Sequence, residues 1–336
     1  MDTLISAPNA ARARVQNRAL QTQLLNSLDY LASECAASGL VDQGEFRAWI
    51  TAARARRPSP ACFAAYYDLV AAIEKGRRRK VSRLFKAIMS APHMEDEITI
   101  RRLGDDYASD ETRRIRRFMG SEKTGASGVR RPNPRAAKAF EETLRQAIDW
   151  IGRRAPELAA EIEASISEII LVGPDRSGRG EFEGGTCFKL TGALVLNAER
   201  EASVADLIVT LAHEAGHAIL FGECLDEMLV ENPDTDLFWS PIRQSKRPLE
   251  GIFHAGFVSS RMLWVLDRMD GDSQFSLHEQ IDMTTARADS SQVFAECVSI
   301  VGQNAQLTST GARILQQMSD DLARRCLDQP ALQAAS

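Results

Sequence analysis

The sequence predicts an α+β protein that is mostly helical and contains one small sheet. Three observations support this fold class. Apolar residues recur at helical spacing through most of the chain, strand-like segments occur only between residues 168 and 199, and a sharply delimited helix follows these segments. We expect the sheet to pack on that helix and a helical region to precede both.

The first 118 residues are expected to form a helical N-terminal region. One helix, over residues 60–76, begins with a proline and ends at a glycine, as helices commonly do. Residues 119–134 (MGSEKTGASGVRRPNP) have no apolar periodicity, which predicts a linker or mobile loop. A long helix begins at residue 135, so we assign residues 135–336 to a second domain that carries the chemistry.

Two segments ahead of the central helix predict strands. Residues 168–173 (EIILVG) are a short apolar run, and residues 187–199 (CFKLTGALVLNAE) are rich in β-forming residues and broken by Gly192. The stretch TCFKLTGALVLNA can be interpreted as an edge strand that pairs with an extended peptide, or as an ordinary core strand. Both interpretations stay open from the sequence.

The composition is that of a soluble globular protein, with 44% hydrophobic and 26% charged residues. We expect no segment to span a bilayer, because no apolar run is long enough, and the N-terminus lacks the apolar core of a secretory signal. The six cysteines are scattered without a C-x-x-C pair. We therefore expect a cytoplasmic protein with no membrane partner.

Charge is distributed unevenly along the chain. Residues 1–155 carry a net charge of +10 and residues 156–336 carry −15, which together give −5. The basic half includes the runs GRRRK (76–80) and RRIRR (113–117). Such runs are typical of solvated helix surface, although they could also attract an acidic peptide or nucleic acid. No aromatic residues interleave with them, so nucleic acid is the less favoured partner.

The segment TLAHEAGHAILFG contains the motif H-E-x-x-H at His213, Glu214 and His217. A capping-box-like start at Ser203 and a glycine stop predict a helix over residues 204–221. Because the two histidines are four residues apart, their imidazoles project side by side and can bind one metal ion. Glu214 lies between them, where it can act as a general base.

A metal site of this kind needs a third protein ligand. The downstream candidates are Glu223, Glu227, Glu231, Glu250 and His254. A second helix, predicted from Pro248 to a stop near Gly271, places His254 one turn after Glu250. We predict His254 as the third ligand and Glu250 as the alternative, since imidazole and carboxylate both suit such metals.

An arginine on the second helix adds a further signal. Arg261 lies on the same stripe as Glu250 and His254. A guanidinium beside a metal can grip a carboxylate bidentately, which an enzyme that chelates a dicarboxylate requires and a peptidase does not. Arg247 and Arg243 are secondary candidates, and Arg243 can also be interpreted as part of an exposed salt bridge.

The run HEAGH, followed by SPIRQSKRPLEGIFHAGFVSSR, resembles the HExxH-type α-ketoglutarate-dependent peptide β-hydroxylases of bacterial peptide natural-product pathways, most clearly over residues 185–270. The resemblance implies a zincin-like metal domain that holds Fe(II) and uses α-ketoglutarate and O2. It implies His213, His217 and His254 as iron ligands, and Arg261 on the distal carboxylate of the cosubstrate. Glu214 would then orient a ligand or a water molecule.

We therefore expect an oxygenase that hydroxylates the β-carbon of a residue in a peptide, such as a precursor peptide held partly by the basic N-terminal half. The main alternative is a metallopeptidase with Zn(II) on the same histidines and Glu214 as general base. A third is a non-catalytic protein that binds a peptide or nucleic acid. Arg261→Met distinguishes the first two, since only the oxygenase would lose cosubstrate binding.

Overall fold

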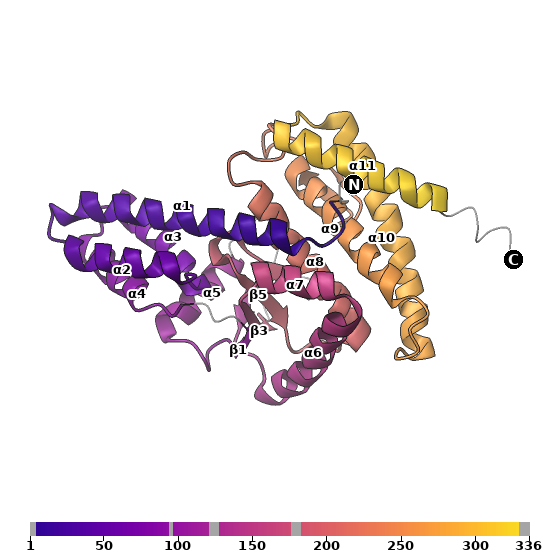
Figure 1. Ribbon diagram of the computed structural model, residues 1–336, viewed down its shortest axis with the longest axis horizontal. Helices are drawn as coiled ribbons and strands as arrows, with labels where there is room; N and C mark the ends of the chain where they lie inside the picture. The colour runs from indigo at the N-terminus through magenta and orange to yellow at the C-terminus, as the bar shows by residue number, and fades with distance from the viewer. Residues whose placement is uncertain (1–4, 94–96, 121–127, 176–182, 329–336) are drawn as a thin grey trace, which may run out of the picture. The chain divides into compact units, whose positions relative to one another are not determined.

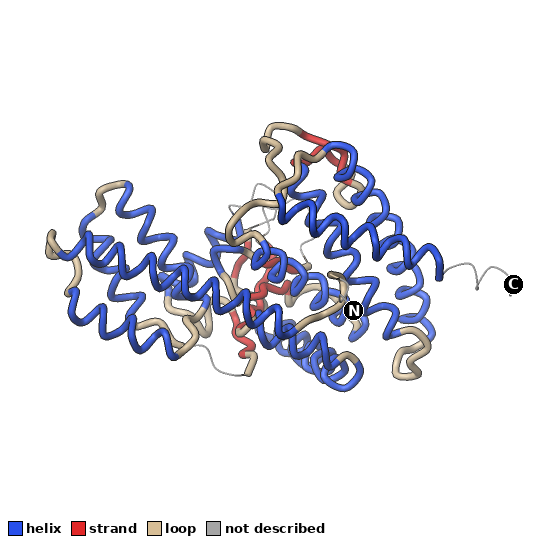
Figure 2. Tube along the Cα trace, turned by 45° about the horizontal axis from the view of Figure 1, so that its top comes forward, coloured by secondary structure: helices blue, strands red, loops and turns tan. Residues whose placement is uncertain are grey.

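The computed structural model describes residues 5–93, 97–120, 128–175 and 183–328 of the chain. Helices predominate, as the blue segments of Figure 2 show, and the predicted mostly helical α+β class is confirmed. The described residues contain eleven α-helices, a small mixed sheet of five strands and a separate two-stranded hairpin.

Internal contacts divide the chain into two compact units that alternate along the sequence. Unit 1 contains Met1–Ala10, Thr143–Ala159 and Ala202–Ser336, and unit 2 contains Ala11–Glu142 and Ala160–Glu201. The domains predicted from the sequence are three continuous ranges, 1–118, 119–134 and 135–336, whereas each unit combines separate segments. These domain ranges stay a prediction.

The helices of unit 2 follow the local signals of the sequence. They are α1 (Ala10–Ala36), α2 (Gln43–Ala55), α3 (Pro60–Glu74), α4 (Arg78–Met89) and α5 (Ser109–Gly120). The helix predicted over residues 60–76 is α3, and Gly76 has a φ of 60° that suits glycine. In the predicted linker, residues 121–127 lie outside the described residues, and Val129–Arg130 form a short strand, β2.

The sheet of unit 2 has a parallel centre. The strands β1 (Thr99–Arg102), β3 (Glu168–Pro174) and β5 (Ala193–Asn197) run parallel, and β4 (Gly184–Thr186) pairs antiparallel with β5. The fifth strand, β2, pairs antiparallel with the end of β3. All of β5 and nearly all of β3 are buried, which is typical of central parallel strands.

The two segments predicted as strands are confirmed in part. Residues 168–173 lie in β3, whereas residues 187–199 divide at Gly192 into a 3-10 turn, η1 (Phe188–Leu190), and β5. Gly192 has a φ of 90°, which other residues adopt only with strain. Because β5 pairs with β3 on one side and β4 on the other, the core-strand interpretation holds for β5 and the edge-strand interpretation is wrong.

Unit 1 is built from four long helices and a hairpin. The helices are α8 (Val204–Glu223), α9 (Leu249–Met269), α10 (Leu277–Asn304) and α11 (Ser309–Asp328), and the hairpin of β6 (Leu237–Ser240) and β7 (Ser245–Pro248) precedes α9 (Figure 1). Two further helices, α6 (Pro134–Arg154) and α7 (Pro156–Ser165), each begin in one unit and end in the other.

A glycine lets α9 approach the two helices that follow it. A Cβ atom on Gly256 would lie 2.8 Å from the Cβ of Cys297 on α10 and 3.0 Å from the Cε of Met318 on α11. Real Cβ atoms do not come this close to other heavy atoms, so a side chain at this position would push the helices apart. Gly256 thus permits the close packing of α9, the helix that carries Glu250 and His254.

The most apolar helix of unit 1 is α8. Among the described residues it is the one helix long and apolar enough to cross a membrane, so the prediction that no segment could do so is wrong on length and composition. The central helix of a globular unit meets the same criterion, and 61% of the apolar window of α8 is buried within the structure. The burial of α8 is consistent with a core helix.

Candidate metal centre

The motif helix α8 begins where its capping residues predict. The Ser203 hydroxyl accepts a hydrogen bond from the Asp206 amide, and the Asp206 carboxylate accepts one from the Ser203 amide. The helix ends at Glu223, two residues beyond the predicted end, so the predicted helix is confirmed. Its apolar residues are buried, while His213 and His217 are half-buried and four residues apart.

The helix α9 packs antiparallel to α8 and presents its own site residues to the motif. His213 Nδ1 lies 3.3 Å from Met262 Sδ, and His217 Nδ1 lies 3.2 Å from His254 Nδ1. A later residue of α8 therefore contacts an earlier residue of α9, as in an antiparallel pair. This packing brings His254, predicted as the third ligand, next to the second histidine of the motif.

Gly216, between the two motif histidines, makes this close approach possible. A Cβ atom there would lie 3.2 Å from Val258 Cγ1 and 3.3 Å from Arg261 Cγ. These distances are tighter than ordinary van der Waals contact, so α9 would have to shift to accommodate an alanine. The glycine of the motif therefore sets the separation of the two helices at the histidines.

Three histidines and one carboxylate form a cluster at this helix pair. The ring centroids of His213 and His217 are 4.9 Å apart, and those of His217 and His254 are 5.4 Å apart. Glu250 Oε1 lies 3.5 Å from His254 Nε2. Glu250 Oε2 is buried and has no hydrogen-bond partner among the described residues. A buried carboxylate oxygen without a donor is costly, and such an atom is suited to accept a ligand.

Both motif histidines are held in the neutral form. Burial, followed by the positive charge of Arg243, lowers the pKa of His213 from 6.5 to about 4. Burial also lowers the pKa of His217, and His213, His254 and Arg243 lower it further. Neutral imidazole is the form that coordinates a metal ion, so both rings are available as ligands at pH 7.

The cluster fits a metal ion in its chemistry and partly in its spacing. Two imidazole nitrogens on one tetrahedral ion, each about 2.1 Å from it, lie about 3.4 Å apart. The separation between His217 Nδ1 and His254 Nδ1 is 3.2 Å. Across the described ranges, however, no three histidine, cysteine, aspartate or glutamate side chains are already grouped so that they could hold an ion. A third ligand therefore requires a rotation of the side chain of His213 or Glu250.

The other downstream carboxylates serve elsewhere in unit 1. Glu223 forms an ion pair with Arg313 of α11. Glu227 Oε1 accepts a hydrogen bond from the Thr310 amide at 2.6 Å, which caps the first turn of α11. Both carboxylates thus hold α11 in place. Glu231 is exposed, and its amide donates a hydrogen bond to the Gln306 carbonyl. Glu250 is the candidate carboxylate that lies 3.5 Å from a histidine of the cluster.

Two charged residues predicted for the site are deeply buried. Glu214 is 5% exposed and Arg261 is 1% exposed. The guanidinium of Arg261 donates a hydrogen bond from Nη1 to the Ser6 carbonyl at 2.9 Å, and its stem packs against Gly216. Arg261 thus connects the N-terminal segment of unit 1 to the motif helix. This arrangement does not favour its predicted role on a cosubstrate, which stays a prediction.

Arg243 is the cation that acts on the motif. It is exposed in the turn between β6 and β7, beside Gln244, whose φ of 46° is unusual for a residue other than glycine. Its positive charge lowers the pKa of both motif histidines. Arg247, the other secondary candidate, is half-buried on β7 opposite Phe238. Of the three candidate arginines, Arg243 is thus the one whose charge acts on the motif histidines.

The sequence patterns did not predict the hairpin that carries these arginines. Three of its large apolar residues are exposed, at 47% for Leu237, 58% for Trp239 and 43% for Ile242. Leu237 and Trp239 are two residues apart on β6 and therefore lie on one face of the ribbon. The short run of β-forming residues LFW, followed by Ser-Pro at the turn, is the signal that could have indicated this strand.

A scan against models of known protein families gives no match to this chain, and a search of curated proteins gives none either. The functional interpretation therefore depends on the residues and the geometry described above.

Proposed function

We propose that this chain is an Fe(II)- and α-ketoglutarate-dependent oxygenase that hydroxylates the β-carbon of a residue in a peptide, on a zincin-like metal domain. The observation that carries the proposal is the helix pair that brings His254 to the H-E-x-x-H motif, with His217 Nδ1 3.2 Å from His254 Nδ1. The exposed Arg243, whose positive charge lowers the pKa of both motif histidines, supports it. A cosubstrate with two carboxylates needs a cation beside its metal ligands, because arginine binds carboxylate bidentately. A peptidase has no general need for one.

The donor set supports the same proposal. Non-haem iron oxygenases bind iron through two histidines and one carboxylate on one side of the ion. His217 and His254 would supply the two histidines, and Glu250 would supply the carboxylate after its side chain rotates. His213 is the further histidine beside them. Either three histidines or two histidines with Glu250 would hold the ion and leave positions for α-ketoglutarate and O2.

Iron, when bound, supplies the oxidising chemistry: a peptide C–H, α-ketoglutarate and O2 give C–OH, succinate and CO2. The residues of the chain bind and orient. Arg243 holds the distal carboxylate of α-ketoglutarate, and the neutral imidazoles hold the metal. Glu214, buried within α8, orients a neighbouring ligand group. The close packing of α8 on α9 keeps bulk water from one side of the cluster.

The hairpin supports a peptide as the substrate. Its exposed apolar residues Leu237, Trp239 and Ile242 occur in the same element as Arg243. Large exposed apolar side chains on one short ribbon are typical of a surface that contacts another chain. The backbone of the ribbon also offers unpaired groups to an extended peptide, since β6 pairs with β7 alone among the described strands.

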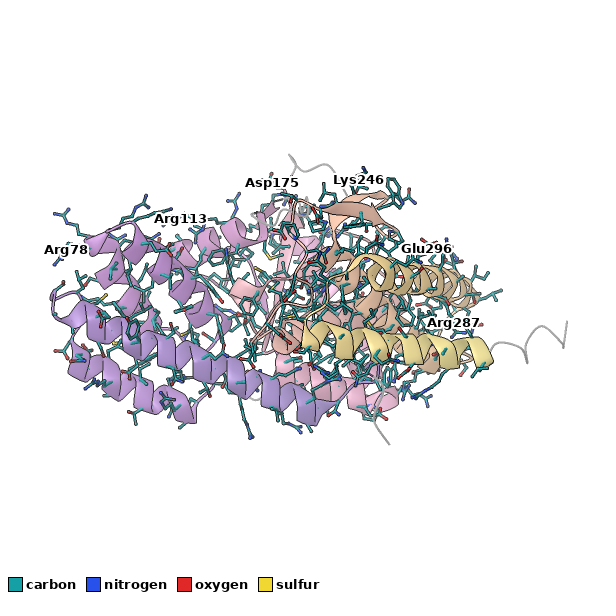
Figure 3. The ribbon with its side chains drawn as sticks, turned by 90° about the horizontal axis from the view of Figure 1, so that it is seen from above. Arg78, Arg113, Asp175, Lys246, Arg287 and Glu296 are labelled. Atoms are coloured by element: carbon teal, nitrogen blue, oxygen red, sulfur yellow. The ribbon has the colours of Figure 1, made fainter. Side chains whose placement is uncertain are left out.

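The first test is the anaerobic complex. Metal-free protein loaded with Fe(II) and α-ketoglutarate should show a visible charge-transfer band, and O2 should then yield succinate. Arg243→Gln should weaken α-ketoglutarate binding at least about tenfold, because the variant loses a bidentate ion pair. Lys246→Gln is the matched control, since Lys246 is exposed on the same hairpin (Figure 3) and does not act on the histidines.

The competing function is the zinc metallopeptidase with Glu214 as general base. Absence of the band, together with zinc that resists removal, would contradict the oxygenase and leave the peptidase. Glu214→Gln would then abolish peptide cleavage while zinc stays bound. Arg261→Met is a poor discriminator, because the buried guanidinium holds the Ser6 carbonyl and its loss would disturb the fold.

A further inference from the structure

The two basic runs of the sequence, 76–80 and 113–117, both lie in unit 2. The first lies at the start of α4 and the second on α5, and both helices pack against α3. Asp68 of α3 accepts hydrogen bonds from two arginines of the second run, Arg114 at 3.0 Å and Arg117 at 2.5 Å. Burial alone would raise the pKa of Asp68, but these two arginines and Lys80 of α4 lower it below its ordinary value. The second run thus binds Asp68 directly, and the first run acts on it through the charge of Lys80.

A surface of exposed cations lies on these two helices. We call it the basic surface and define it by exposed residues on the outer faces of two helices: Arg79, Arg83 and Lys86 of α4, and Arg113, Arg116 and Arg117 of α5. On α4 these positions follow the i, i+4, i+7 spacing of a single face, opposite the buried residues of the helix. Figure 3 shows the neighbouring Arg78 of α4 and Arg113 of α5 projecting toward the same side.

The α4 part of the basic surface lacks counter-charges. No aspartate or glutamate occurs between Lys75 and Met94 in the sequence. Among the described residues, no carboxylate forms an ion pair with Arg79, Arg83 or Lys86. Unpaired cations this close together repel one another, so the surface is locally unfavourable in the free protein.

The helix dipole adds to this cost. Arg77 is the N-cap of α4, and Arg78 and Arg79 follow in its first turn, which contains no acidic residue. Cations at a helix N-terminus oppose the positive end of the dipole. Arg78 donates a hydrogen bond to the Ser38 carbonyl, which gives it a structural role, but Arg79 has no such contact among the described residues. Residues that violate a local rule without a structural gain are expected at functional positions.

We propose that the basic surface binds an acidic segment of about six residues in a peptide. The twelve residues of α4 form a helix about 18 Å long, which about six residues of extended chain would cover. Arginine forks match carboxylates, and five of the six cations are arginine. The identity of the occupant as a peptide rests on the proposed function, but the surface itself does not.

Nucleic acid fits the same surface less well. The aromatic residues of α4 and α5, Phe85 and Phe118, are buried and cannot stack on bases. The whole chain carries a net charge of −5, which repels a long polyanion once it extends beyond the patch. A short acidic segment feels mainly the local cations, because solvent ions screen charges beyond about 8 Å.

The test uses the metal-free full chain and a fluorescein-labelled peptide of six glutamates, with a six-glutamine peptide and a 12-base-pair DNA duplex as competitors. Anisotropy should show binding that weakens steeply with salt. Arg79→Gln/Arg83→Gln should weaken it about tenfold, since each exposed ion pair contributes up to about a factor of five. The matched control is Arg14→Gln/Arg18→Gln on α1, two exposed arginines with the same spacing and charge in unit 2.

The possible results separate cleanly. An equal loss in both double variants, or no binding of the glutamate peptide, would overturn the proposal. Tighter binding of the duplex with the same dependence on Arg79 and Arg83 would replace the peptide by nucleic acid. Because the assay contains no iron or α-ketoglutarate, a failed oxygenase assay leaves its result unaffected. Thermal unfolding of each variant checks that the fold is retained.

Discussion

Buried ionisable groups are arranged in opposite ways in the two units. In unit 2, Glu168 of β3 accepts hydrogen bonds from the Tyr107 hydroxyl at 2.6 Å and from Arg101 at 3.0 Å, and Asp68 accepts two from arginines. In unit 1, the histidines face one another and one carboxylate oxygen of Glu250 lacks a partner. Glu168 and Asp68 thus have hydrogen-bond donors, whereas one oxygen of Glu250 has none among the described residues.

This difference distinguishes buried groups that stabilise the fold from buried groups that are available for chemistry. Burial raises the pKa of Glu168, and its bonds to Tyr107 and Arg101 oppose that rise, so its partners stabilise the charged form in place. A fully bonded network of this kind rigidifies a core. The histidine cluster carries an energetic cost in the free protein that an ion would relieve, so ligand binding should stabilise unit 1 in particular.

The largest expected effect is at the satisfied network. Asp68→Asn should lower the free energy of unfolding by about 3 kcal/mol, because it leaves the buried Arg114 without its counter-charge. Glu250→Gln should cost less than about 1 kcal/mol in the metal-free protein, since one of its oxygens bonds to nothing described. Urea denaturation of both variants makes the comparison. A similar loss in the two would show that the contrast between the units does not hold.

The next effect is a pH dependence confined to the metal-free protein. An unfolded histidine takes up a proton near pH 6.5, whereas His213 in the folded chain does so only near pH 4. Its contribution to stability is therefore complete above about pH 6.5 and is lost as the pH falls toward 4, on the order of 2 kcal/mol. His213→Asn should reduce this dependence in denaturation curves, because His217, whose pKa is also lowered, still contributes to it. A variant at the exposed His278 should leave the dependence unchanged.

A smaller effect separates packing from ligand geometry. Gly216→Ala should change stability by no more than about 1 kcal/mol, because the gain in helix propensity offsets the tight contacts with Val258 and Arg261. It should still weaken Fe(II) binding at least about tenfold, since it moves His217 away from His254. Gly302→Ala on α10 is the control: nothing lies within 4 Å of its Cβ position, so it should stabilise the protein and leave metal affinity unchanged. Calorimetric metal titration of the two variants would decide the point, and equal affinities would contradict the role assigned to Gly216.

The sequence was informative wherever a local signal coincided with the final structure. The capping residues Ser203 and Asp206 fixed the start of α8, and the spacing of His213 and His217 placed both on one face. The second helix and its His254 followed from Pro248 and helical periodicity. These features depend on neighbours in the chain, so one sequence was enough to predict them.

Features that depend on distant residues were missed. Arg261 lies on the predicted stripe, but nothing in the sequence signals that its guanidinium bonds to the carbonyl of Ser6. The influence of Arg243 on the histidines arises from an unpredicted hairpin. The hydrogen bonds of Arg114 and Arg117 to Asp68 likewise depend on the packing of α5 against α3. The periodicity of a sequence does not indicate long-range contacts of this kind.

The bond between Arg261 and Ser6 also bears on how the protein is made. Its two ends are 255 residues apart, and α9 leaves the ribosome long after residue 6 has done so. Ile5 and Ser6 are almost fully buried in the folded protein. This segment therefore lacks its partner Arg261 while most of the chain is synthesised. The unit with the candidate metal centre is therefore completed late in synthesis, after most of unit 2 is already available to fold.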